Sequence, residues 1–200
     1  MPFVWFMRLW GLFGKRMRVV GRQDVRVDDA FGDGDRIVDL GGGGEGVIGR
    51  LRGRQVVAVD LRQGELDDAP DGPTKVVGDA RALPFPDGSF DAATAFFFLM
   101  YVQDADRDKV LAEAYRVLRP GGTFRIWDAV IPEPPENPPR LFVVPVRVSL
   151  PRATVRTAYG TGWQGKAMSC DGLAARAEAV GFTVIEKEQR GNTFRLVAMR

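Results

Sequence analysis

Two residue types are scarce in this 200-residue sequence, which has no histidine and a single cysteine, Cys170. Zinc sites are built mainly from cysteine and histidine, and histidine is the usual general base near neutral pH. The composition therefore excludes a zinc centre of that kind, a histidine base and an internal disulfide framework, and we expect no metal site. Cys170 is not expected to act as a nucleophile, because it has no histidine partner.

Long apolar runs are also missing. Met1 to Phe13 is rich in aromatic and aliphatic residues, but Arg8 interrupts it and it is too short to span a bilayer. It lacks the features of a secretory signal, so we expect a cytoplasmic protein. We interpret residues 1–30 as an N-terminal amphipathic helix that docks as a lid, with contact of residues 1–20 with a membrane surface as the alternative. Residues 31–200 are predicted to form one domain, because their length suits a single core.

Basic residues are concentrated in two stretches, although the net charge is only +2. An anionic partner and a solvated surface both explain such clusters. The basic residues of the two stretches are Arg8, Lys15, Arg16, Arg18, Arg22 and Arg26, then Arg140, Arg147, Arg152, Arg156 and Lys166.

Short apolar strands alternate with helical patterns from Arg36 to Trp127. This alternation predicts an α/β, Rossmann-like, doubly wound sheet of seven strands, mostly parallel, with an antiparallel C-terminal strand and helices on both faces. The predicted strands are Arg36–Leu40, Gln55–Asp60, Thr74–Val77, Phe90–Phe97 and Thr123–Trp127, and the predicted helices are Val47–Leu51, Arg62–Ala69 and Asp104–Leu118.

The pattern changes after residue 131. Five prolines between Pro132 and Pro139 predict a stiff connection. Residues 132–166 are interpreted as an insertion that covers the substrate. The later elements are predicted as a hairpin of Leu141–Val148 and Ala153–Tyr159, a helix from its N-cap Asp171 to Val180 with Gly181 as its stop, and a closing hairpin of Phe182–Glu188 and Thr193–Met199.

A glycine-rich loop, Asp39-Leu-Gly-Gly-Gly-Gly-Glu-Gly46, follows the first predicted strand of this domain and precedes a helix. Glycines are needed where a backbone turns sharply against a ligand. Gly41, Gly43 and Gly46 also satisfy the G-x-G-x-x-G dinucleotide pattern, and Asp60 at the end of the next strand suits ribose hydroxyls in either case. The loop and Asp60 therefore leave two alternatives open, an S-adenosylmethionine-dependent methyltransferase and an NAD-dependent oxidoreductase.

Three later features separate these alternatives: Gly78-Asp79-Ala80 after the third strand, Arg119-Pro-Gly-Gly122 after a helix, and the closing antiparallel pair. With them, residues 36–127 resemble the class I S-adenosylmethionine (SAM)-dependent methyltransferases, particularly the branch of ubiquinone/menaquinone-biosynthesis and small-molecule methyltransferases. The resemblance implies SAM as the cofactor, S-adenosylhomocysteine (SAH) as its product and a small-molecule methyl acceptor.

The resemblance also implies which residues of the glycine loop contact SAM. Asp39, Gly41, Gly42 and Gly43 match the loop that wraps the methionine and ribose. The family usually has a third glycine where this chain has Glu45, and we expect the Glu45 side chain to face the amino group of SAM.

Five positions outside the loop match further cofactor contacts of the family. Asp60 would bind the ribose, and Leu61 would pack on the adenine. Asp79 and the backbone N–H of Ala80 would bind the adenine, and Phe96 would contact the methionine moiety. The alternatives are a turn or helix-cap aspartate for Asp79 and simple core packing for Phe96.

Methyl transfer is an in-line displacement, so alignment and exclusion of water are the main tasks of the enzyme. Some acceptors also need a base. Without histidine, the candidates are Tyr101, Asp104, Asp128, Glu133 and Tyr159. We expect Tyr101 and Tyr159 to be the catalytic residues of the pocket, with capping or surface hydrogen bonding as the alternative for each.

The basic residues of the insertion favour an anionic acceptor, with Arg147 and Arg156 as the test positions. The same hairpin is a candidate for homodimer contacts. An RNA or protein methyltransferase and a non-catalytic SAM-binding protein are the competing functions. A nucleic-acid partner is not expected, because no appended binding domain is recognisable.

Overall fold

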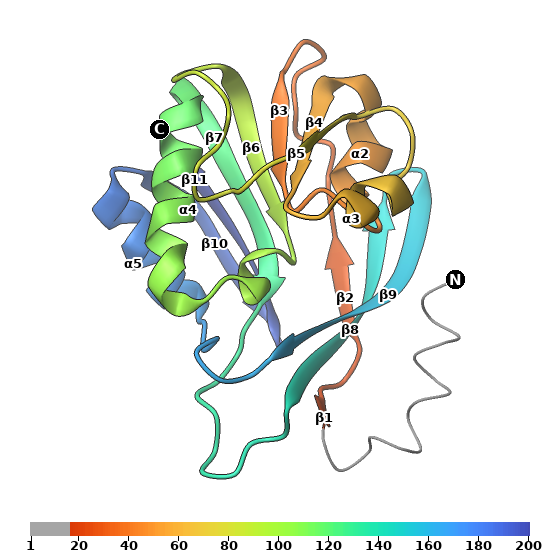
Figure 1. Cartoon of the computed structure of the whole chain (residues 1–200), viewed down its shortest axis with the longest axis vertical. Helices are drawn as coiled ribbons and strands as arrows, with labels where there is room; N and C mark the ends of the chain where they lie inside the picture. Colours follow the sequence, from red (N-terminus) through yellow and green to blue (C-terminus); the bar gives the residue numbers. More distant parts are fainter. Residues whose placement is uncertain (1–16) are drawn as a thin grey trace.

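The computed structural model describes residues 17–200. Its centre is a seven-stranded sheet with the strand order β10-β11-β7-β6-β3-β4-β5 (Figure 1). The strands are parallel except β11, which is antiparallel to both neighbours. The bounds are Ile37–Leu40 for β3, Val56–Asp60 for β4, Thr74–Val77 for β5, Phe90–Phe96 for β6, Leu118–Ala129 for β7, Thr183–Arg190 for β10 and Thr193–Met199 for β11. The predicted sheet is therefore confirmed.

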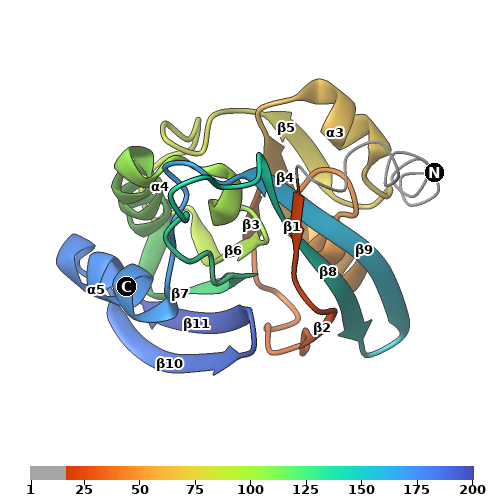
Figure 2. The same ribbon diagram turned by 90° about the horizontal axis from the view of Figure 1, so that it is seen from below.

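Helices cover both faces of this main sheet, as predicted (Figure 2). α2 (Val47–Arg52) and α3 (Gln63–Asp68) lie on one face, and α4 (Asp104–Val117) and α5 (Cys170–Val180) lie on the other. Val110, Leu111, Ala114 and Val117 of α4 are fully buried, because their spacing places them on one side of the helix. The Arg119-Pro-Gly-Gly122 segment does not separate helix from strand: it lies inside β7, which is longer than the predicted Thr123–Trp127.

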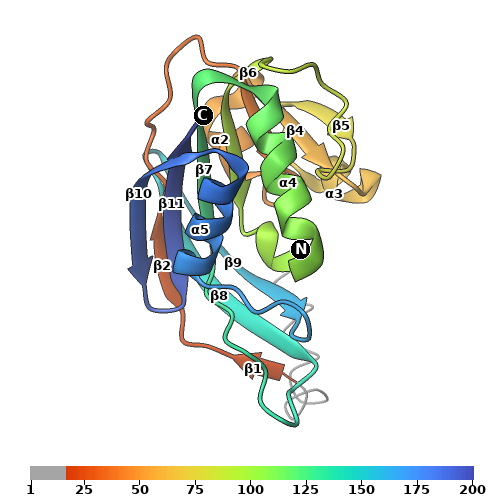
Figure 3. The ribbon, with the colours of Figure 1, turned by 90° about the vertical axis from the view of Figure 1, so that its left-hand side faces the viewer.

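A second sheet packs beside α2, on the same side of the main sheet (Figure 2). β8 (Leu141–Leu150) and β9 (Ala153–Gly162) form the predicted antiparallel hairpin. β1 (Met17–Val19) and β2 (Gln23–Arg26) pair with the other edge of β8 in parallel. Figure 3 shows β1 and the lower end of β8 extending beyond the main sheet.

The expected N-terminal helix over 1–30 is wrong for its described part. Met17–Val19 and Gln23–Arg26 are strands, because β8 has an edge opposite β9 whose backbone groups need partners. The helix expected in Met1–Phe13 and its lid function fall outside the described residues. Within residues 17–200, no helix combines the length and apolar character needed to cross a membrane.

α5 begins slightly earlier than predicted. Its N-cap is Ser169, whose Oγ accepts a hydrogen bond from Gly172 N at 3.0 Å. Asp171 is therefore not the cap. It lies in the first helical turn and forms an ion pair with Lys187 at 2.5 Å. The predicted stop is confirmed, since Gly181 follows the helix with a φ of 121°.

Candidate active site

The glycine loop joins β3 to α2 at the carboxyl edge of the main sheet. Gly41 N and Gly42 N donate to Val59 O at 2.8 and 3.1 Å, and Gly44 N donates to Glu65 O at 2.7 Å. The loop is thus tied both to β4 and to α3. Its conformation is set by the protein's own backbone contacts, as a preorganised ligand site requires.

Gly41, Gly42, Gly43 and Gly46 of the loop leave no room for a side chain, and Gly41 and Gly43 show this most clearly. Gly41 has a φ of 71°, and a Cβ there would overlap the ring of Phe98. At Gly43 a Cβ would lie 2.5 Å from Glu65 Cβ and 2.9 Å from Asp60 Oδ2. Glycine therefore lets the loop backbone lie closely against Phe98, Glu65 and Asp60.

Two cavities meet along this edge. The glycine-loop cavity, of about 440 Å³, lies between the loop, the end of β6 and β9. The Asp79 cavity, of about 460 Å³, lies between the end of β4, the turn after β5 and the short 3₁₀ helix η2 (Leu99–Tyr101). Gly41, Asp60, Arg62, Phe98 and Tyr101 line both cavities, so we treat them as one elongated cleft.

Carboxylates dominate the charged groups of the glycine-loop cavity. Asp39, Glu45, Asp60 and Glu65 line it together with one arginine, Arg62, which pairs with Glu65 at 2.7 Å. Such a lining suits a ligand that carries positive charge and opposes the pyrophosphate of a dinucleotide.

Asp39 is the most buried of these carboxylates. It is 2% exposed, and its Oδ1 accepts a hydrogen bond from Thr94 Oγ1 at 2.7 Å. Burial raises the pKa of Asp39 to about 7, and the nearby charge of Asp60 acts in the same direction. A cationic group in the cleft would therefore stabilise the ionised form of Asp39.

The predicted ribose and adenine residues lie from the middle of the cleft to its other end. Asp60 Oδ1 accepts from Arg62 N at 3.0 Å, which directs this carboxylate along the edge of the cleft. Leu61 is 65% exposed, and Leu61, Asp79 and Ala80 all line the Asp79 cavity.

Arg81 is a residue of this cavity that the sequence did not indicate. Asp79 Oδ1 accepts from Arg81 N at 2.9 Å, so Asp79 also serves as a turn aspartate. Arg81 Nη2 contacts Asp79 Oδ2 at 2.7 Å, and these hydrogen bonds hold the pKa of Asp79 below its usual value. Asp79 is therefore an ionised acceptor held in a fixed orientation.

Glu45 lies in the cavity lining, but its side chain also has a partner on β9. Glu45 Oε1 accepts a hydrogen bond from Thr157 Oγ1. The residue that replaces a family glycine thus links the glycine loop to the second sheet. Sequence reasoning could not find Thr157, because the two residues are 112 positions apart.

An aromatic group closes the cavity opposite the glycine loop. Phe96 ends β6, and Phe97 follows with a φ of 48°, a conformation rare for a side chain of this size. The Phe97 ring stacks on Tyr159 of β9 at 4.6 Å, with an angle of 10° between the planes. Phe96 packs against both Phe97 and Tyr159, so it serves the core as well as the cavity.

The two predicted catalytic tyrosines are brought together in this cavity. Tyr101 is 46% exposed as a residue, but desolvation of its hydroxyl and nearby carboxylates raise the pKa to about 12. Burial raises the pKa of Tyr159 well above its usual value. Both hydroxyls are therefore protonated near neutral pH, and they act as hydrogen-bond donors or acceptors.

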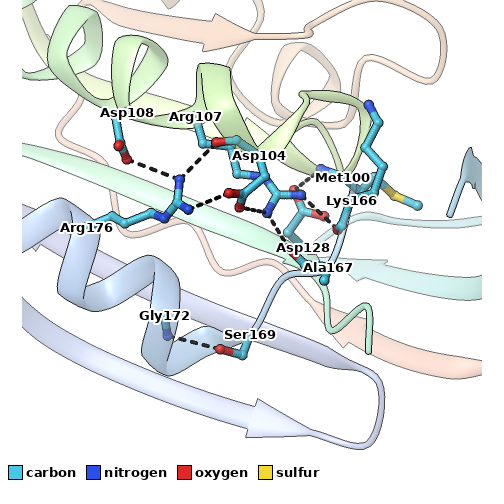
Figure 4. A network of polar contacts seen from close by, with 10 residues as sticks. All are labelled: Met100, Asp104, Arg107, Asp108, Asp128, Lys166, Ala167, Ser169, Gly172 and Arg176. Carbon is cyan, nitrogen blue, oxygen red and sulfur yellow. Dashed lines mark hydrogen bonds and ion pairs between the residues drawn. The ribbon is translucent and has the colours of Figure 1, made fainter. Parts of the chain in front are cut away.

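Two buried charged residues position the segments that carry these tyrosines (Figure 4). Asp128 is fully buried at the end of β7, and its Oδ2 accepts from Leu99 N at 2.7 Å and from Met100 N at 3.3 Å. These bonds fix η2 and hence Tyr101. Burial raises the pKa of Asp128 to about 7, while the charge of Arg107 opposes this shift.

Arg107 of α4 holds the chain that leaves β9. It is 2% exposed and donates to Lys166 O at 2.8 Å and to Ala167 O at 2.6 Å (Figure 4). Asp104 N donates to Gly165 O at 3.1 Å, so three consecutive carbonyls are held by the start of α4. Lys166 Nζ in turn donates to Tyr101 O.

The sequence contained a signal for Arg107 that our prediction did not use. Arg107 precedes Val110, Leu111 and Ala114 at helical spacing, so it is a charged residue on the apolar side of the predicted helix. Such a residue needs buried partners, because an unpaired buried charge is costly.

The other three base candidates are absent from the described lining of the cleft. Asp104 pairs with Arg176 at 2.7 Å, and Asp104 and Glu133 line a separate cavity near the start of α5. Asp128 is absent from the described lining of the cleft and is committed to the backbone of η2. The described structure therefore does not support a base function for any of the three.

The predicted acceptor contacts of Arg147 and Arg156 also lack support from the geometry. The two residues are opposite each other on β8 and β9, and neither belongs to the cleft lining. Side chains alternate along a strand, so Arg156 points to the face opposite that of Thr157 and Tyr159. The geometry therefore gives an acceptor in the cleft no contact with either arginine.

Comparison with known proteins identifies the family of this chain. The methyltransferase domain family matches residues 38–126. A demethylmenaquinone methyltransferase of Mycobacterium sp. (strain KMS) is 33% identical over 177 residues, which cover 78% of this chain and 70% of that protein. A ubiquinone/menaquinone biosynthesis C-methyltransferase of Stenotrophomonas maltophilia (strain R551-3) is 40% identical over 109 residues, covering 48% of this chain.

The match spans less than half of the Stenotrophomonas protein, 42% of its length. Among solved structures, a SAM-dependent methyltransferase from Mesorhizobium loti superposes with a TM-score of 0.60 at 21% identity, covering 84% of this chain and 91% of that one. At this identity the likeness concerns the fold. Fold, site and sequence define one class: the chain belongs to the class I SAM-dependent methyltransferases.

The residues present fit the cofactor of this family, SAM. The backbone at Gly43 lies close against Asp60, the matched ribose acid, because a Cβ there would lie 2.9 Å from Asp60 Oδ2. The carboxylates of the glycine-loop cavity suit the ammonium and sulfonium groups of SAM. Together the two cavities provide an elongated cleft in which Asp60 lies between the glycine loop and Asp79.

Proposed function

We propose that this protein transfers a methyl group from SAM to a small, flat acceptor. The observation that carries the proposal is the glycine-loop cavity, in which Phe97 and Tyr159 face the cofactor loop. The names of the two curated relatives, a demethylmenaquinone methyltransferase and a C-methyltransferase, support a small-molecule acceptor.

The cofactor side of the proposed mechanism depends on carboxylates. Asp60 would accept hydrogen bonds from the ribose hydroxyls, and Asp79 would accept one from the adenine amino group. Asp39 would stabilise positive charge at the methionine end. SAM would supply the electrophilic methyl group of its sulfonium and leave as SAH.

The acceptor side depends on positioning by neutral groups. The stacked rings of Phe97 and Tyr159 line the cavity and exclude water, and Tyr101 hydrogen-bonds a polar atom of the acceptor. Because both phenols keep their protons near neutral pH, they orient the acceptor and do not act as phenolate bases. The rate enhancement then comes mainly from in-line alignment in a cleft that excludes water.

The test is a transfer assay with SAM labelled in its methyl group. A panel of small aromatic acceptors, including a demethylmenaquinone analogue, is offered beside total RNA and total protein. We expect label in at least one small molecule and background label in the polymers. Label in RNA or protein alone would identify a macromolecular methyltransferase. SAM binding without transfer to any acceptor would support a non-catalytic SAM-binding protein.

A further inference from the structure

The second sheet carries a charge unlike that of the rest of the chain. Its segments, residues 17–27 and 140–162, contain seven arginines and one acid, Asp24. Since the whole chain has a net charge of only +2, the remaining residues carry more acidic than basic groups. The positive charge is thus concentrated on one layer of the molecule, which Figure 2 shows beside the main sheet.

Most of this charge has no internal partner. Within residues 17–200, Arg147 pairs with Asp24 at 2.9 Å, and the other six arginines form no ion pair. Residues 1–16 contain no aspartate or glutamate, so their side chains offer no carboxylate. The six arginines are exposed: Arg18, Arg22, Arg26, Arg140, Arg152 and Arg156.

The strand register places like charges side by side. Arg147 and Arg156 are directly opposite each other on β8 and β9, and Asp24 of β2 is the next residue across. Like charges at opposed positions destabilise a sheet, so one aspartate beside two arginines leaves an excess that an external anion would relieve. These residues lie on the face opposite Tyr159 and thus point away from the cleft.

The apolar residues near this face favour a lipid surface over nucleic acid as its anionic partner. Leu141 of β8 is 38% exposed, and Met17 is its partner on β1. The aromatic side chains of β8 and β9, Phe142 and Tyr159, lie on the opposite face, so the described strands offer bases no ring to stack on at this face. Residues 1–16, which lead into β1, combine aromatic and aliphatic residues with Arg8, Lys15 and Arg16, a composition typical of interfacial segments.

We propose that the outer face of the second sheet docks the protein onto an anionic lipid surface. Arginines near such a surface each add attraction that falls with salt, and apolar side chains add a second contribution. Docking through this face leaves the inner face of β9, with Tyr159, directed at the cleft. The methyltransferase would then work at a membrane surface, which goes beyond its proposed chemistry.

The experiment measures cosedimentation of the full chain with vesicles. Vesicles of phosphatidylcholine with phosphatidylglycerol are compared with pure phosphatidylcholine, at low and high salt. The variants are Arg156→Glu and the triple variant Arg26→Glu, Arg152→Glu, Arg156→Glu, in which Arg26 pairs with Ser149 and so lies on the same face as Arg147. Arg54→Glu is the matched control, since Arg54 is exposed on η1 (Gly53–Gln55), outside the second sheet. Circular dichroism and SAH binding check that each variant is folded.

We expect binding to anionic vesicles alone, weakened by salt. The triple variant should lower the partition coefficient by roughly 100-fold or more, and Arg156→Glu by about tenfold, with Arg54→Glu within about twofold of wild type. Equal binding to neutral vesicles, no vesicle binding, or a triple variant that binds like wild type would overturn the proposal. Binding to RNA with a steep salt dependence but not to vesicles would assign the face to nucleic acid. Loss of SAH binding by the wild type would contradict the proposed function, whereas the vesicle results test only the docking face.

Discussion

The glycine loop and β9 face each other across the same cleft, yet they are held in place differently. The loop is fixed by backbone hydrogen bonds to β4 and α3 and by glycines that admit no side chain. β9 is held over the cleft by side-chain contacts. Thr157 hydrogen-bonds Glu45, Tyr159 stacks on Phe97, and Arg107 hydrogen-bonds the backbone of the segment that follows β9. The cofactor side is therefore sensitive to backbone change, and the acceptor side can be altered one side chain at a time.

Gly41→Ala should have the largest effect on the cofactor side. The new Cβ would overlap Phe98 in a backbone conformation that alanine adopts poorly. A loop displaced by about 1 Å should lose roughly 100-fold in SAH affinity. Calorimetry checks this, with Gly64→Ala as the control because no atom lies within 4 Å of a Cβ there. Unchanged SAH affinity in Gly41→Ala would show that the loop is not rigid.

Arg107→Met tests the attachment of the chain after β9. The substitution leaves two buried carbonyls without their donors, and we expect a loss of about 3 kcal/mol in the free energy of unfolding. Amide exchange in residues 153–168 should increase as well. Arg176→Met is the control, since its ion pairs with Asp104 and Asp108 do not involve that chain. Equal losses of unfolding free energy in both variants would mean that Arg107 does not hold the chain after β9.

Asp39→Asn tests the buried carboxylate through pH. Because the pKa of Asp39 is raised in the folded state to about 7, its contribution to stability is present below its unfolded value, 3.8, and is lost as pH rises through 7. The wild type should therefore lose stability between pH 4 and 7 with a slope of up to about 1.4 kcal/mol per pH unit from this group.

Asp39→Asn should remove that part of the slope, while Asp128 maintains a similar one of its own. Urea unfolding at several pH values measures both. An identical slope in wild type and variant would contradict the burial of a titrating Asp39.

Thr157→Val should have the smallest effect. It removes one hydrogen bond to Glu45. We therefore expect the free energy of unfolding to fall by about 1 kcal/mol and the SAH affinity to change by less than about fivefold. Amide exchange in β9 should rise slightly, and Thr154→Val, an exposed position on the other face, should leave it unchanged. If Thr157→Val weakened SAH binding as strongly as Gly41→Ala, the distinction between the two sides would be lost.

The same contrast explains what the sequence could predict. The main sheet and the loop follow local rules: apolar runs, glycines and turn residues mark β3, β4 and the loop between them. The cofactor candidates from Asp39 to Phe96 gather in the cleft, apart from Gly42, which packs behind the loop against Ala58. Their contact with SAM remains a prediction.

The errors lie where contacts are distant in sequence. Residues 17–26 form strands because β8, more than a hundred residues later, provides the edge on which they pair. The Glu45–Thr157 bond and the contacts of Arg107 likewise join remote segments. The helical pattern marks Arg107 as a buried charge, but no local pattern indicates its partners or the Glu45–Thr157 bond. Ser169 replaced Asp171 as the cap because both residue types suit that position.

The most direct measurement of the central claim is a calorimetric titration of the full chain with SAM, SAH and NAD. The carboxylate-lined glycine-loop cavity predicts one SAM or SAH per chain and no binding of NAD. Binding of NAD, or no binding of either SAM or SAH, would contradict it.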